Sequence, residues 1–169
     1  MAIFIITFGA FIVGILLIVS LKKISPPTPQ EKIHFDNPDD VPKYLRDQTA
    51  FKDKCVEFLE KFNLEYVHSV WANDHELEIA MNDETPVVGG VYLALCIIDP
   101  PGQTVNAIKV KGFLDTVKGE GASRGIFITT GYFSDEAIRS IDEEPVELVD
   151  VVSFISYLKR FGIYENPSP

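Results

Sequence analysis

Residues 90–98 have the sequence Gly-Val-Tyr-Leu-Ala-Leu-Cys-Ile-Ile, and this stretch decides the fold. A Gly-Gly pair precedes it and Asp-Pro-Pro-Gly follows it, so turn-forming residues bound an almost unbroken apolar run. Such a run is typical of a strand buried on both faces of a sheet, although periodicity alone also permits a short buried helix. We expect it to form the centre of an α/β sheet.

The apolar patterns on either side predict one helix and two strands before this stretch, and alternating helices and strands after it. The predicted strands cover 64–70, 75–82, 90–98, 125–131 and 146–149. The predicted helices cover 49–62, 105–118, a short segment after Ser134, and 151–161. The predicted helix N-caps are Thr49, Ser134 and Asp150, and Gly162 is expected to end the last helix. Strand–helix alternation with apolar strands indicates α/β architecture with parallel pairs.

The same patterns predict which side chains are buried. In strand 75–82, Leu77 and Ile79 are expected on one face and Glu76 and Glu78 on the other, because strand side chains alternate. In helix 105–118, Ile108 is expected on the apolar face. The inward-facing positions expected in the last helix are Val152, Ile155, Leu158 and Phe161.

Length and charge limit the possible functions. The chain has 169 residues, which suits one ordinary domain with an appendage. Its formal net charge is −10, and every acidic residue follows residue 23. A domain this acidic is repelled by nucleic-acid phosphates and by anionic lipid unless its basic residues gather on one face.

The first segment, residues 2–21, contains no charged side chain and is long enough to cross a bilayer as a helix. A cleavable signal peptide would need basic residues before the apolar core and a small-residue cleavage site, and the sequence has neither. We therefore expect an uncleaved transmembrane helix. Lys22 and Lys23 follow it directly, so the positive-inside tendency places the C-terminal domain in the cytoplasm.

These features predict four parts of the chain. Residues 1–23 form the membrane anchor, and residues 24–46 form a proline-rich spacer, because proline stiffens a linker. A ligand for a proline-binding partner is the alternative interpretation of the spacer. Residues 47–164 form the α/β domain, and residues 165–169 form a tail.

The segment Gly-Ala-Ser-Arg-Gly-Ile-Phe-Ile-Thr-Thr-Gly-Tyr-Phe-Ser-Asp-Glu-Ala (121–137), followed by 146–162, resembles the catalytic domain of Mrr-type restriction endonucleases. These enzymes belong to the PD-(D/E)XK nuclease superfamily. The resemblance in pattern runs from about residue 51 to residue 162. It implies a three-layer α-β-α sandwich with a mixed central sheet, here preceded by a single transmembrane helix.

In that family, one strand supplies an Asp and the next supplies a Gln/Glu-x-Lys pair. The carboxylates hold Mg²⁺, and the lysine helps to stabilise developing negative charge. The resemblance places the Asp at Glu78 and the Gln/Glu-x-Lys pair at Ala94 and Cys96, where neither side chain can perform its role. A further family acid corresponds weakly to Glu57.

Together with the apolar segment at 2–21, the resemblance predicts a membrane-anchored nuclease fold that no longer cuts DNA and serves as a binding or scaffold module without a cofactor. Its partner would be a protein or DNA. An active Mg²⁺-dependent DNA endonuclease with a rearranged site is the alternative, in which Lys109 or Lys111 supplies the missing cation. In a third possibility the site serves another ligand through a reactive Cys96, although Cys55 and Cys96 match no metal or redox motif and are expected to be buried thiols.

Two further groups of charged residues have competing interpretations. Asp74, Glu76 and Glu78, with His75 between them, predict either a divalent-metal cluster or a solvated hairpin end. The basic residues Lys109, Lys111, Lys118 and Arg124 could contact phosphates. The lysines could instead form ion pairs along the helix with Asp115, one turn away from two of them.

Overall fold

The structure is a computed structural model that describes Ile33 and residues 41–165. The predicted membrane segment at 2–21, and most of the predicted spacer, lie outside the described residues. Within the described part, no helix has both the length and the apolar character that crossing a bilayer requires.

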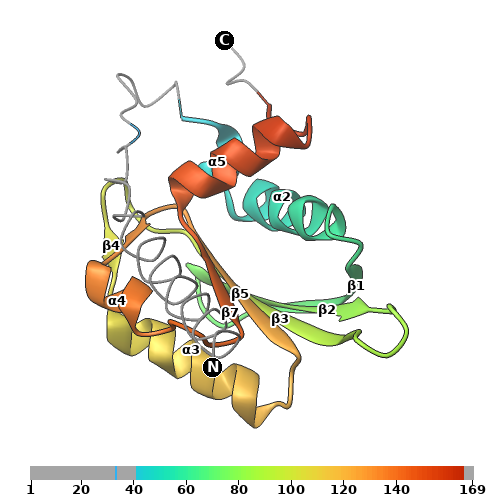
Figure 1. Cartoon of the computed structure of the whole chain (residues 1–169). Helices are drawn as coiled ribbons and strands as arrows, with labels where there is room; N and C mark the ends of the chain where they lie inside the picture. Colours follow the sequence, from blue (N-terminus) through green and yellow to red (C-terminus); the bar gives the residue numbers. More distant parts are fainter. Residues whose placement is uncertain (1–32, 34–40, 166–169) are drawn as a thin grey trace, which may run out of the picture. The chain divides into compact units, whose positions relative to one another are not determined.

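The described residues form an α/β fold around a mixed sheet of five strands in the order β1-β2-β3-β5-β7 (Figure 1). These strands are β1 Glu65–Trp71, β2 Glu76–Asp83, β3 Gly90–Ile97, β5 Arg124–Thr129 and β7 Val146–Val149. β3 pairs with β2 in antiparallel and with β5 in parallel orientation, and it is the central strand, as its apolar run predicts. Two short strands that the periodicity did not predict, β4 Thr104–Val105 and β6 Tyr132–Phe133, form a second, parallel pair.

Helices cover both faces of the sheet. The helices are the short 3-10 helix η2 Lys43–Leu45, α2 Gln48–Glu60, α3 Ala107–Gly119, α4 Asp135–Arg139 and α5 Val151–Arg160. Figure 1 shows α2 and α5 on one face, and α3 and α4 on the other. The three layers are therefore α2/α5, the sheet, and α3/α4.

Each face of the sheet has its own apolar core. Under α2 and α5, aromatic side chains dominate, and the Phe58 and Phe154 rings meet edge to face at 5.2 Å between centroids. Under α3, Phe113 packs against Phe127 at 5.5 Å. α3 packs closely over Gly125 of β5. Position 125 requires glycine, because a Cβ there would come within 2.6 Å of Val117 and 2.9 Å of Phe113. These two cores fix which side chains of β2 and β3 remain available for a site.

Helix caps and helix faces follow the sequence with some exceptions. The Ser134 and Asp150 side chains accept hydrogen bonds from Ala137 N and Ser153 N, which confirms both as N-caps. The cap of α2 is Asp47, which accepts from Ala50 N, and the expectation of Thr49 was wrong. Asp and Thr can both cap a helix, so the composition alone did not decide between them.

The predicted apolar faces of two helices also need correction. Ile108 is 82 % exposed, because at the second position of α3 it borders an open groove and is not part of the core. In α5 the fully buried positions include Phe154 and Leu158, whereas Val152 and Phe161 are only half-buried. The predicted helical spacing of buried residues in α5 is confirmed, but the buried face is centred one residue away from the predicted one.

Candidate functional site

The candidate site lies on the face of β2 and β3 that carries α3. Glu78 of β2 pairs in register with Leu95 of β3, and Glu76 pairs with Ile97. Residues that pair directly in a sheet share a face, so both carboxylates project on the α3 side. Leu95 and Ile97 pack into the core under α3, which agrees with this assignment.

Ala94 and Cys96 lie on the opposite face of the sheet from Glu78. Their register partners are Ile79 and Leu77, and all four side chains belong to the core under α2 and α5. Although the Ala94 position borders the groove on the α3 side, its side chain is 3 % exposed and packs in that core. The structure therefore does not bring the two predicted β3 positions together with Glu78.

The residues that β3 presents beside the carboxylates are Leu93, Leu95 and Ile97. Successive side chains of a strand point to opposite faces, so Ala94 and Cys96 do not share a face with these three residues. None of these three side chains can hold a metal ion or supply a cation. The β3 side chains on the face of Glu78 are therefore all apolar.

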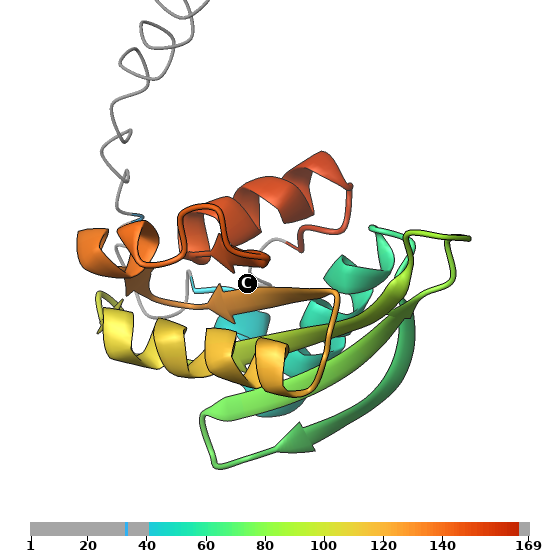
Figure 2. The same cartoon turned by 60° about the horizontal axis from the view of Figure 1, so that its bottom comes forward.

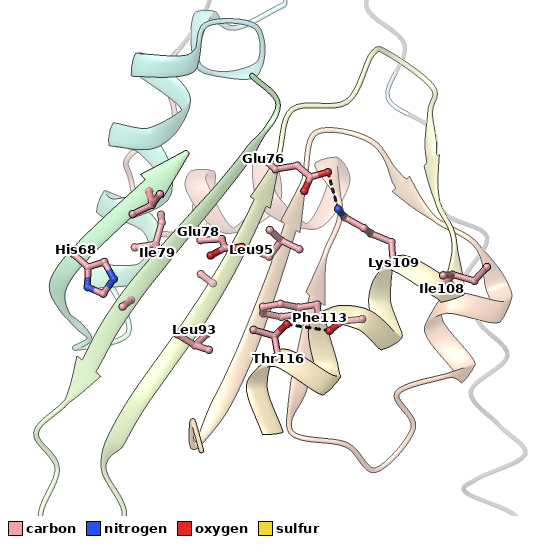
Figure 3. A pocket seen from close by; sticks show the side chains of 14 residues that line it. His68, Glu76, Glu78, Ile79, Leu93, Leu95, Ile108, Lys109, Phe113 and Thr116 are labelled. Atoms are coloured by element: carbon pink, nitrogen blue, oxygen red, sulfur yellow. Dashed lines mark hydrogen bonds and ion pairs between the residues drawn. The ribbon is translucent and has the colours of Figure 1, made fainter. Parts of the chain in front are cut away.

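A cation reaches the site from another element. Lys109, near the start of α3, places its Nζ 2.6 Å from Glu76 Oε1, as Figure 3 shows. The two side chains are 40 % and 26 % exposed, so solvent still reaches the pair. Glu78 is exposed and lies two positions along the same strand face. Its carboxylate makes no ion pair or hydrogen bond with the residues that the structure describes.

These residues border an open groove of about 360 Å³ between the sheet and α3 (Figure 3). Leu93 and Leu95 lie along it, His68 and Val70 of β1 border it on the sheet side, and Ile108 on the helix side. His68 had no recognisable partner in the sequence, because only the pairing of β1 with β2 places it there. A second hollow of about 670 Å³ shares Glu76 and Lys109 with the first.

The predicted acidic metal cluster does not form. Among the residues that the structure describes, no three histidine, cysteine or acidic side chains are arranged to hold a metal ion. Asp74 and His75 are exposed at the hairpin end, and Lys109 already neutralises Glu76. Mg²⁺ is usually held by one or two carboxylates, with waters and substrate phosphates completing its shell. The residues present fit this ion poorly, because the Lys109 ammonium group occupies the Glu76 carboxylate at 2.6 Å and brings a positive charge to the position of the ion.

Glu57, the weakly predicted additional acid, lies far from this groove. Its Oε2 is 2.7 Å from Lys54 Nζ, which also binds Glu165 at 2.7 Å and the carbonyl of Ile163 at 3.0 Å. Lys54 belongs to α2, which covers the other face of the sheet (Figure 1). The Glu57 carboxylate therefore pairs with Lys54 on that face of the sheet and does not face Glu78.

The lysines predicted to contact nucleic acid are already partly neutralised. Lys118 Nζ lies 2.8 Å from Glu144 Oε2, so Lys109 and Lys118 both have acidic partners from other elements. The predicted partner Asp115 is not the one used in either ion pair. Lys111 is exposed on the same helix.

The paired threonines of the second buried strand have a structural role. Thr129 Oγ1 donates to Asp99 Oδ2 at 2.6 Å and accepts from Gly131 N at 2.9 Å. Thr130 Oγ1 accepts from Asp99 N at 2.8 Å and donates to the Asp99 carbonyl at 2.9 Å. These bonds tie the segment after β3 to the end of β5, and they occupy both threonine hydroxyl groups.

The two cysteines come from different elements but adjoin each other. Cys55 of α2 and Cys96 of β3 are both free and fully buried. Burial, and then a hydrogen bond with Cys96, raise the pKa of the Cys55 thiol well above its usual range. The expectation of buried thiols is confirmed.

The order of strands, the helices on both faces and the carboxylates on β2 define a restriction-endonuclease-like fold. A model of the Mrr catalytic domain, described as a restriction endonuclease, matches residues 48–158, which is more than half of the chain. The chain therefore belongs to the Mrr-type restriction endonuclease family. A search of curated proteins gives no match.

Two solved structures are similar to this chain. The DNA modification-dependent restriction endonuclease AspBHI matches with a TM-score of 0.50 at 12% sequence identity, over 80% of this chain and 40% of that chain. The MspJI restriction endonuclease, solved in complex with a 27-mer oligonucleotide, matches with a TM-score of 0.48 at 20% identity, over 70% of this chain and 28% of that chain. The chain thus spans less than half of either enzyme, and the likeness concerns the fold.

Proposed function

We propose that this chain is a catalytically silent Mrr-type domain that acts as a binding or scaffold module at a membrane. The observation that carries this proposal is the identity of the β3 side chains beside Glu78, which are Leu93, Leu95 and Ile97. Hydrolysis of a phosphodiester by this superfamily depends on metal-bound carboxylates and a cation that stabilises developing charge. Apolar side chains at these positions remove both contributions, and a domain without its chemistry retains only its surfaces.

An active endonuclease with a rearranged site is the second candidate, and the position of Lys109 favours it. Its ammonium group lies 2.6 Å from Glu76 and borders the same groove as Glu78, where a migrated catalytic lysine would be needed. The ion pair is also the argument against it, since an ammonium bound to Glu76 occupies one of the two carboxylates that a metal ion would require. We therefore rank this candidate second.

A cleavage assay separates the two candidates. The full chain in detergent is incubated with supercoiled plasmid and Mg²⁺ or Mn²⁺, together with the Glu78→Ala and Lys109→Ala variants. Because AspBHI is described as modification-dependent, methylated plasmid is included as well. We expect no metal-dependent cleavage above the level of Glu78→Ala. Cleavage that disappears in both variants would establish the rearranged endonuclease.

Membrane attachment through residues 2–21 is the second part of the proposal, and the sequence supports it. The full chain should remain in the membrane fraction after an alkaline carbonate wash, and deletion of residues 2–21 should release it. Protease added to inverted vesicles should degrade the domain, whereas protease added to right-side-out vesicles should spare it. The reverse pattern would contradict the cytoplasmic orientation.

A further inference from the structure

The outer face of the β1–β2–β3 hairpins is only partly covered by α3. Val70 of β1 is 56 % exposed and Ile108 of α3 is 82 % exposed, and both border the groove. Leu93 is half-buried and lines the same groove (Figure 3). Figure 2 shows the β1–β2 hairpin extending away from α3. This arrangement leaves an apolar groove between the strands and the helix.

The charges around the groove are mostly negative. Its two connected hollows have the acidic residues Asp74, Glu76, Glu78 and Asp99 along them. Among the described residues that line either hollow, Lys109 is the one lysine or arginine, and His68 and His75 are the histidines. A nucleic acid would bring more negative charge to this surface, whereas a cationic segment would find an opposite charge there.

The Lys109–Glu76 ion pair shows how a cation is received in the groove. Lys109 belongs to α3, and its Nζ atom reaches across the groove to within 2.6 Å of the Glu76 carboxylate on β2. Glu78 projects from the same face two residues further along β2, and no described residue forms an ion pair with it. A second carboxylate is therefore available to a cation that another molecule supplies.

We propose that this groove is the docking site for a basic, amphipathic segment of a partner protein. Apolar side chains of the segment contact Val70, Leu93 and Ile108, and an arginine or lysine of the segment contacts Glu78. Apolar anchors surrounded by charge contacts are the usual way in which a groove gains both affinity and specificity. This assignment rests on the proposed function, since a working nuclease would need the same groove for its substrate.

The test uses the full chain in nanodiscs of zwitterionic lipid and a displayed library of random peptides. Peptides that bind empty nanodiscs are removed first, because amphipathic peptides also bind lipid. The enriched sequences should combine apolar residues with arginine or lysine. No enrichment, or enrichment of acidic sequences, would overturn the proposal.

Variants then locate the binding of one enriched peptide. Ile108→Asp and Glu78→Lys should each weaken it about tenfold or more, as expected for loss of an anchor contact. The matched controls are Val88→Asp and Glu84→Lys, which make the same changes at exposed positions outside the groove and should leave binding unchanged. Equal loss of peptide binding in the two controls would contradict the assignment. Binding of a DNA duplex to the wild type that Ile108→Asp abolishes, and that the controls leave unchanged, would contradict it as well. The cleavage assay does not depend on the peptide, so the two proposals can fail separately.

Discussion

Glu78 and Leu95 face each other across β2 and β3, and both side chains project toward α3. In a working member of the superfamily, a ligand or cation of the neighbouring strand would stand beside the carboxylate. Here Leu95 is 7 % exposed and belongs to the apolar core under α3. The β3 side chain beside Glu78 is therefore part of the core, and the proposal of a silent nuclease fold rests on this packing.

Lys54 should contribute measurably to stability. It is 5 % exposed and binds two carboxylates and the Ile163 carbonyl, which ties α2 to the C-terminal segment. Because Glu57 and Glu165 are 42 % and 73 % exposed, solvent compensates part of their loss. We expect Lys54→Met to lower the free energy of unfolding by about 1–2 kcal/mol in denaturant titrations. Lys61→Met, at the exposed end of the same helix, should change it by less than about 0.5 kcal/mol.

The contribution of Lys54 should also depend on pH. Burial alone would lower the pKa of Lys54, but hydrogen bonds with Glu165 and Glu57 outweigh burial and raise it above its ordinary value of 10.5. A raised pKa in the folded state stabilises the fold fully below the unfolded pKa, and this stabilisation is lost as the pH rises through the folded pKa. The stability difference between wild type and Lys54→Met should thus stay constant from neutral pH to about pH 9 and shrink above pH 10.5. An unchanged difference in strong alkali would show that packing, not charge, is responsible.

Thr129→Val should weaken the connection between β3 and β5. The variant keeps the shape of the side chain but leaves Asp99 Oδ2 and Gly131 N without their partner. Thr129 is fully buried, so we expect a loss of about 1–3 kcal/mol in the free energy of unfolding. The control is Thr116→Val, which removes an exposed hydroxyl that bonds to the Gly112 carbonyl, and it should have little effect. A Thr129→Val protein as stable as this control would contradict the structural role of the motif.

The cysteines should resist modification in the native fold. Both thiols are fully buried, and the raised pKa of Cys55 keeps that thiol protonated. Titration with a thiol reagent should label neither cysteine in the native protein and both in denaturant, while Ala72→Cys, at an exposed turn, should react at once. Rapid native labelling of Cys96 would instead favour a site repurposed around that thiol.

The sequence predicts much of this fold because its signals are local. The apolar run of β3 and the caps Ser134 and Asp150 depend on residues that are close in the chain. The two-residue strands β4 and β6 are too short for periodicity to reveal. Contacts between residues far apart in the chain cannot be predicted from local patterns. The ion pair of Glu76 and Lys109 is an example, because it joins β2 to α3. Which β3 side chains lie beside Glu78 also depends on the register of β2 against β3, and no local pattern in the sequence contains that register.

Binding of Mn²⁺ by the full chain tests the central claim most directly, because the claim concerns the ligands around Glu78 and needs no assumption about a substrate. Electron paramagnetic resonance measures free Mn²⁺ during a titration of the wild type and of Glu78→Gln. We predict that the two proteins give the same curve, with weak binding spread over the acidic surface. A saturable site in the wild type that Glu78→Gln abolishes would contradict the account of a silent nuclease fold.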